Sequence, residues 1–155
     1  MATRIMVNGH QHHVEATPDT PLLYVLRNEL GLNAARYGCG LSRCGACTVH
    51  VDGEAIHACV VPVGEVAGRE VTTLEGLGTP EALHPLQQAF LDEQAAQCGY
   101  CIPGIVMTAA ALLARNPSPS DGEIREALEG KLCRCGSHQR ILRAIRRAAG
   151  MGTPS

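Results

Sequence analysis

Eight cysteines in 155 residues constrain this chain more than any other feature of its sequence. They fall into two sets of four, one in each half of the chain: Cys39, Cys44, Cys47 and Cys59, then Cys98, Cys101, Cys133 and Cys135. The first residues contain no long apolar run and no twin-arginine pair, so no secretory signal is expected. Because thiols stay reduced in the cytoplasm, metal ligation is favoured over a disulfide framework.

The first set has the spacing Cys-x4-Cys-x2-Cys, with the fourth cysteine twelve residues further on. This is the plant-type spacing for a [2Fe–2S] cluster. Gly38, Gly40 and Gly45 permit the tight turns by which one short segment wraps a cluster and points backbone N–H groups at its sulfurs. A zinc site is the alternative, since Cys44-x2-Cys47 alone is a common zinc half-site. The additional upstream cysteine and the single distant partner favour iron–sulfur.

The second set is ambiguous from spacing alone. Each of its pairs precedes an expected helix, and the partial positive charge of a helix N-terminus favours thiolates and an anionic cluster. Both zinc and an iron–sulfur cluster accept four thiolates, and Cys98-x2-Cys101 could also be a redox dithiol. The residues by themselves leave these alternatives open.

The first half of the chain is predicted to be rich in strands. Alternating segments at Thr3–Asn8 and His12–Thr17 flank Gly9 and suggest a hairpin, and Asp52-Gly53 indicates a second hairpin. Thr20 is a plausible N-cap for a helix that Gly31 ends. Further strands are expected at residues 47–51, 54–61 and 70–74.

The second half has a helical period. Helices are expected at residues 85–95, 104–115, 121–128 and 138–149, with Ser120 and Glu123 forming a capping box. Gly76–Pro80 has the composition of a linker. The chain is therefore predicted to be an α+β protein with domains at residues 1–76 and 81–155, joined by a linker at 77–80.

Composition and motifs exclude several functions. A net charge of −2 and the lack of an arginine-rich strip argue against nucleic acid binding. No apolar run reaches the roughly 18 residues that a membrane span needs, so direct membrane insertion is not expected. No dinucleotide or Walker motif is complete, and the seven histidines show no metal-ligand pairing. Every cysteine is already assigned, so no catalytic residue is expected.

Three segments carry a resemblance to a known family. Gly38–Val49 resembles the first cluster loop of the iron–sulfur subunits of the xanthine oxidase family, and Gln97–Gly104 and Leu132–Gly136 resemble that family's second cluster site. The similarity spans roughly Ile5 to Ala149. It implies a β-grasp, plant-type ferredoxin domain followed by a four-helix bundle domain, with one [2Fe–2S] cluster on each set of cysteines.

The resemblance also implies a partner and a role. A large subunit would hold a molybdenum–pterin cofactor near the second cluster, with Gln97 and Cys135 beside the pterin. Oxidation at molybdenum releases two electrons and a [2Fe–2S] centre accepts one at a time, so two clusters in series would pass electrons from molybdenum to an external acceptor. The chain would then be the non-catalytic redox subunit of a molybdenum oxidoreductase, with an aldehyde as the favoured substrate and an N-heterocycle as the alternative.

The segment Gly136–Ile141 departs from the family's commoner pattern. It resembles small subunits of the isoquinoline oxidoreductase type and of bacterial membrane-associated aldehyde dehydrogenases, which often use c-type cytochromes. A cytochrome acceptor is therefore expected rather than an FAD protein. The chain is expected to fold in the cytoplasm without a signal of its own. The resemblance also allows a periplasmic, inner-membrane-associated complex, reached together with partner subunits.

Two other classes of protein stay open. A free-standing two-cluster ferredoxin would be stable and soluble when expressed alone. A zinc-stapled interaction module would be colourless.

Overall fold

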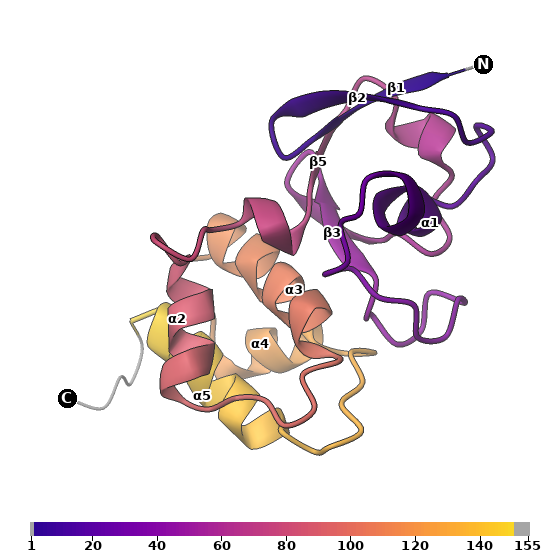
Figure 1. The fold of residues 1–155 in the computed structure, drawn as a ribbon. Helices are drawn as coiled ribbons and strands as arrows, with labels where there is room; N and C mark the ends of the chain where they lie inside the picture. Colours follow the sequence, from indigo (N-terminus) through magenta and orange to yellow (C-terminus); the bar gives the residue numbers. More distant parts are fainter. Residues whose placement is uncertain (1, 151–155) are drawn as a thin grey trace.

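The computed structural model describes residues 2–150. Met1 and residues 151–155, at the outer ends of the two predicted domains, lie outside the described residues. Figure 1 shows two lobes: the strands and α1 form one of them, and the helices α2–α5 form the other. Each lobe has its own hydrophobic core.

A five-stranded mixed sheet forms the first lobe. Its order is β2-β1-β5-β3-β4, with β1 and β5 parallel and the other neighbours antiparallel. The strands are β1 (Thr3–Val7), β2 (His10–Val14), β3 (Thr48–Val51), β4 (Glu54–His57) and β5 (Glu70–Thr72). Both predicted hairpins are confirmed, although their strands are shorter than expected. Their turn residues, at 8–9 and 52–53, all have positive φ, as a type I′ turn requires.

The helix against this sheet begins differently from the prediction. Helix α1 (Leu22–Tyr24) continues as a π-helical segment, η1 (Val25–Glu29), and it ends before Gly31 as expected. The predicted N-cap at Thr20 is wrong: Pro21 occupies that position, and no side chain caps the helix. The reason is that the N–H of Leu22 donates to the carbonyl of Val61 at 2.8 Å. A backbone carbonyl from another segment of the same chain therefore takes the place of a side-chain cap.

Four helices form the second lobe: α2 (Pro85–Asp92), α3 (Ile102–Arg115), α4 (Asp121–Ala127) and α5 (His138–Ala148). Two short 3₁₀ segments, η2 (Val63–Val66) and η3 (Leu74–Gly76), precede them. Helix α3 begins at Ile102, two residues earlier than predicted. The capping box of Ser120 and Glu123 is confirmed, with the Ser120 N–H donating to the Glu123 carboxylate at 2.7 Å.

Helix α2 has a cap that the sequence did not reveal. The ring nitrogen Nδ1 of His84 accepts a hydrogen bond from the N–H of Leu86 at 3.1 Å. In return, the side chain of Gln87 accepts from the N–H of His84 at 2.9 Å. These two bonds satisfy backbone donors that the first turn of a helix otherwise leaves free.

Helix α3 makes the main contact between the lobes, where it lies against β3 (Figure 1). A Cβ added at Gly104 would lie 2.1 Å from the carbonyl oxygen of Gly45, so only glycine allows this approach. Further along, the ring Nε2 of the buried His50 donates to the carbonyl of Met107 at 2.6 Å. No helix in the described residues has both the length and the apolar character needed to cross a membrane.

Candidate metal centres

The first set of cysteines belongs to the sheet lobe, and its member Cys44 contacts the helical lobe through Leu132. Three of its members come from the loop between η1 and β3, and Cys59 follows strand β4. In this loop Gly40, Ser42 and Gly45 all have positive φ, which lets the chain turn repeatedly within a few residues. The prediction that glycine would permit this wrapping is confirmed at Gly40 and Gly45.

Backbone N–H groups converge on the sulfur at one end of this loop. The N–H groups of Leu41, Arg43 and Cys44 lie 3.3, 3.2 and 3.3 Å from Sγ of Cys39. Donation by Leu41 and Arg43 lowers the pKa of Cys39 to about 7. The loop is therefore shaped to stabilise negative charge on this sulfur, as an iron ligand requires.

The other end of the loop is buried. Burial raises the pKa of Cys47 to about 12, and this thiol also interacts with those of Cys59 and Cys44. A thiol that is costly to ionise in the free chain becomes a good ligand only when a metal neutralises it. Binding of metal at this end is therefore coupled to release of a proton.

Two glycines of the first cysteine loop lie in close contact with neighbouring side chains. A Cβ added at Gly38 would lie only 2.5 Å from Sγ of Cys44, and one at Gly40 would lie 2.5 Å from the hydroxyl of Tyr37. These glycines leave the room in which four thiolates can converge. The residues present therefore fit a group held by sulfur in this loop.

The second set of cysteines lies at the ends of two helices, as predicted. Cys101 is the N-cap residue of α3, and the pair Cys133 and Cys135 precedes α5. The N–H of Tyr100 lies 3.5 Å from Sγ of Cys98, and the N–H of Ser137 lies 3.4 Å from Sγ of Cys133. Both sets therefore direct backbone donors at sulfur.

The helix ends do not by themselves make these thiols acidic. Burial raises the pKa of Cys101 to about 12, although its residue caps α3. Donation by the Tyr100 N–H lowers the pKa of Cys98, which is exposed. Burial opposes ionisation of Cys133, but the N–H of Ser137 and the thiol of Cys101 outweigh it and lower its pKa. Local hydrogen bonds and burial set the direction of each of these pKa shifts.

Within each set, the thiols interact with one another. In the first set Cys39 interacts with Cys44, and Cys47 interacts with both Cys59 and Cys44. In the second set Cys98 interacts with Cys135 and Cys133, and Cys101 interacts with Cys133 and Cys98. A [2Fe–2S] cluster takes four thiolates, two on each iron, so each set has the number of cysteines that one cluster needs.

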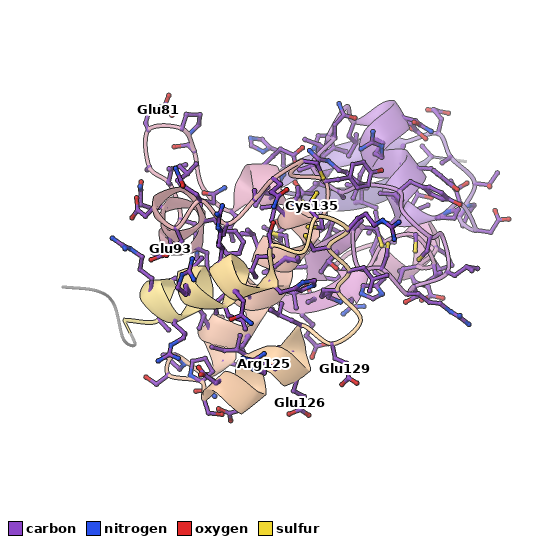
Figure 2. The ribbon with its side chains drawn as sticks, turned by 90° about the horizontal axis from the view of Figure 1, so that it is seen from below. Glu81, Glu93, Arg125, Glu126, Glu129 and Cys135 are labelled. Carbon is purple, nitrogen blue, oxygen red and sulfur yellow. The ribbon has the colours of Figure 1, made fainter. Side chains whose placement is uncertain are left out.

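Gln97 and Cys135, which the resemblance implied would lie beside a pterin, are close to each other in the structure. The side-chain nitrogen of Gln97 lies 3.4 Å from the carbonyl oxygen of Cys135. Figure 2 shows Cys135 near the middle of the molecule, between the two lobes. Beside this pair is a cavity of about 260 Å³ that Gln97, Ser137 and Arg140 help to line.

Ser137 adds an observation about this cavity. Its hydroxyl oxygen is buried, and it has no hydrogen-bond partner among the described residues. Its side chain also helps to lower the pKa of the Cys133 thiol, so the hydroxyl is placed to bond to that sulfur or to a group held beside Cys133 and Cys135. The second set therefore also fits a bound group.

The two sets of cysteines are directly connected. The N–H of Leu132, next to Cys133, donates to the carbonyl of Cys44 at 3.1 Å. Arg36 donates to the carbonyl of Gly99 at 2.7 Å and lies over the ring of Tyr100, whose hydroxyl donates to the carbonyl of Tyr37. Sequence reasoning missed these contacts, because residues about 60 to 90 positions apart carry no local signal of their proximity.

Three arginines of α5 contact the C-terminal end of α2 within the helical lobe. Sequence periodicity placed Arg140, Arg143 and Arg147 on one face of this helix. They all contact the end of α2: Arg143 and Arg147 pair with Glu93, and Arg140 lies 3.4 Å from the carbonyl of Gln94. Arg140 and Arg143 are nevertheless exposed, so this face contacts α2 and also remains accessible to a partner.

Comparison with known families matches both halves of the chain. Residues 5–74 match the family described as "2Fe-2S iron-sulfur cluster binding domain". Residues 73–146 match the family described as "[2Fe-2S] binding domain". The two matches contain the first and the second set of cysteines, respectively.

Individual proteins are similar over almost the whole chain. A nicotinate dehydrogenase subunit of Pseudomonas putida is 62% identical over 145 residues, which are 94% of this chain and 92% of that protein. The alpha subunit of isoquinoline 1-oxidoreductase from Brevundimonas diminuta is 53% identical over 145 residues, covering 93% and 95%. The solved aldehyde oxidoreductase of Desulfovibrio desulfuricans superposes with a TM-score of 0.92 at 40% identity, over 96% of this chain and 17% of that longer chain.

Proposed function

Since the chain belongs to the small iron–sulfur subunits of the xanthine oxidase family of molybdenum hydroxylases, we propose that it carries electrons from a molybdenum site in a larger partner subunit to an external acceptor. When bound, two [2Fe–2S] clusters supply two one-electron carriers in series. The observation that supports this most directly is the hydrogen bond between Leu132 and Cys44, which joins the two sets of cysteines.

The eight cysteines are the proposed ligands. Cys39, Cys44, Cys47 and Cys59 would hold the first cluster, and Cys98, Cys101, Cys133 and Cys135 would hold the second. Support comes from the interactions among the thiols of each set and from the N–H groups directed at Cys39, Cys98 and Cys133.

The proposed partner surface surrounds Gln97 and Cys135. An exposed amide beside a ligand cysteine offers both a donor and an acceptor to a pterin edge. The adjoining cavity and the unpaired hydroxyl of Ser137 support this assignment. We further propose domains at residues 1–76 and 81–155, in which α2–α5 form a four-helix bundle around one core.

We propose an N-heterocycle as the substrate class of the complex. The relatives named for nicotinate and isoquinoline are 62% and 53% identical, whereas the aldehyde oxidoreductase is 40% identical. Aldehyde oxidation, favoured from sequence, stays the second candidate, because the aldehyde oxidoreductase shares the fold with a TM-score of 0.92. Turnover of nicotinate and of an aromatic aldehyde by the purified complex separates the two.

The proposed acceptor is a c-type cytochrome, on the basis of the segment Gly136–Ile141. The compartment follows from it: with a cytochrome acceptor, the complex would work at the outer face of the inner membrane. Cofactor analysis of the native complex is the test. Stoichiometric FAD without a haem subunit would contradict this proposal.

Reduction of the native complex by its substrate tests the proposed function. Two distinct [2Fe–2S] signals should appear in electron paramagnetic resonance spectra when the substrate is added anaerobically. A complex that turns over substrate while both signals stay absent would show that electrons leave by another route.

A further inference from the structure

Lys131 is the only lysine of the chain, and it lies in the loop between α4 and α5. Its side chain reaches across to the other lobe and covers Gly45 of the first cysteine loop. A Cβ added at Gly45 would lie 2.3 Å from Cδ of Lys131 and 3.3 Å from Nζ. The lysine side chain therefore lies against the stretch between Cys44 and Cys47, although it comes from the helical lobe.

The ammonium group of Lys131 is held by hydrogen bonding. Its Nζ lies 2.7 Å from Nε2 of His57, whose Nδ1 lies 2.7 Å from the hydroxyl oxygen of Ser42. An ammonium group can only donate, so Nε2 of His57 accepts and the ring proton is on Nδ1. His57 is therefore neutral, and Lys131 is the charged member of the chain of contacts.

No carboxylate neutralises this charge. Among the residues that the structure describes, the ion pairs involve arginines, and none includes Lys131. Its ammonium group lies instead over Gly45, in the stretch between the candidate ligands Cys44 and Cys47. A half-buried cation that bonds to a neutral imidazole is stabilised further by a nearby negative charge, which a cluster held by Cys44 and Cys47 would supply.

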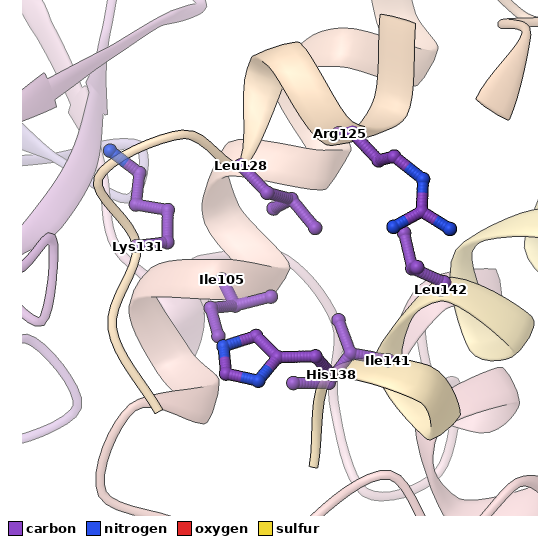
Figure 3. A pocket seen from close by; sticks show the side chains of 7 residues that line it. All are labelled: Ile105, Arg125, Leu128, Lys131, His138, Ile141 and Leu142. Atoms are coloured by element: carbon purple, nitrogen blue, oxygen red, sulfur yellow. The ribbon is translucent and has the colours of Figure 1, made fainter. Parts of the chain in front are cut away.

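The other cation of the same region points elsewhere. Lys131 and Arg125 both line a cavity of about 330 Å³ between α3, α4 and α5. Figure 3 shows the nitrogen of Lys131 turned away from Arg125 and toward the sheet lobe. Arg125 is thus a cation of equal charge in the same lobe that is not directed at the first cysteine loop.

We propose that Lys131 raises the reduction potential of the first cluster, so that an electron passes favourably from the second cluster to the first. Transfer of one electron from the second cluster to the first adds one negative charge to the first cluster and removes one from the second. A cation beside Cys44 and Cys47 stabilises that added charge, and its half-buried position reduces screening by water. This inference rests on the proposed function, which places a cluster on the first four cysteines.

Redox titration of the complete complex, with each cluster followed by electron paramagnetic resonance, tests the proposal. Lys131→Met keeps much of the side chain's length and removes its charge, whereas Lys131→Arg keeps the charge. Arg125→Met removes an equal charge from the other side of the cavity.

Lys131→Met should lower the reduced-to-oxidised ratio of the first cluster at least tenfold at fixed potential, a shift of about 59 mV. The potential of the second cluster should stay unchanged in Lys131→Met. In Lys131→Arg and Arg125→Met, the potentials of both clusters should equal those of the original protein.

Iron and sulfide content must accompany each titration. Full occupancy in Lys131→Met with an unchanged first-cluster potential would overturn the proposal, as would equal shifts of both clusters. If Lys131→Met loses the first cluster, Lys131→Gln is the second neutral variant. Loss of the cluster from both, with retention in Lys131→Arg, would make the lysine a structural anchor and would also overturn it. Absence of iron from the unaltered complex would instead contradict the proposed function.

Discussion

Single glycines decide how closely the two cysteine sets approach each other. Gly104 lies in the first turn of α3, against the backbone of Gly45, and a methyl group there would meet a carbonyl oxygen that cannot move independently of its loop. Sequence reasoning identified Gly45 as a loop glycine. It could not assign Gly104 a role, because the need for glycine arises from a segment about 60 residues away.

A comparison of two helix glycines tests this at the residue scale. Gly104→Ala should destabilise the protein by about 1–3 kcal/mol, because the added methyl forces the lobes apart. Gly122→Ala, in the exposed start of α4 where the nearest atom is 3.8 Å away, should be neutral or stabilising by up to about 1 kcal/mol. Urea unfolding followed by circular dichroism measures both. Equal effects of the two substitutions would contradict the close approach.

The predicted elements correspond to the observed ones wherever a local pattern specifies them. The turns at residues 8–9 and 52–53 and the capping box at Ser120 were predictable, because each needs only neighbouring residues. The N-cap at Thr20 was wrong, because Val61 supplies the acceptor from a distant strand end. The cap by His84 was missed, because histidine is not among the residues usually found there.

This histidine cap gives the start of α2 a pH dependence. Burial and the nearby His50 lower the pKa of His84 below its ordinary value of 6.5. The neutral ring is the form that accepts from Leu86, so the unfolded chain binds the proton more readily. The contribution of the cap is therefore complete above about pH 6.5 and is lost as the pH falls below that value.

Replacement of His84 by Asn isolates this contribution. Asn can accept the same hydrogen bond without titrating in this range, so the variant should lose less stability than the original protein between pH 7.5 and pH 5.5. Urea unfolding at the two pH values supplies the comparison, and the other histidines cancel because both proteins contain them. Parallel losses of stability would show that His84 does not titrate on unfolding.

At the scale of the whole molecule, the interface between the lobes carries the function. The spacing of the cysteines predicted the first site, and the resemblance assigned the second, where spacing alone was ambiguous. The contacts that join them, through Leu132, Arg36 and Lys131, could not be predicted, because they depend on how two separately folded lobes dock. Sequence thus identified the candidate ligands, and structure identified the connection between them.

The order of the two clusters can be tested by removing one ligand at a time. Cys44→Ser should leave reduction of the second cluster by substrate intact and block delivery to the acceptor. Cys98→Ser should stop both, because the second cluster comes first in the proposed path. Since metal binding contributes to folding, the content of the remaining cluster must be measured in each variant. Normal reduction of the first cluster in Cys98→Ser would show that the order is wrong.

The central claim is that eight cysteines hold two [2Fe–2S] clusters, and metal analysis tests it most directly. Iron, acid-labile sulfide and zinc should be measured in the anaerobically purified complex and related to the amount of this chain. The account predicts four irons and four sulfides for each chain, in a red-brown protein, after subtraction of any iron held by a haem partner. Stoichiometric zinc without sulfide would contradict it.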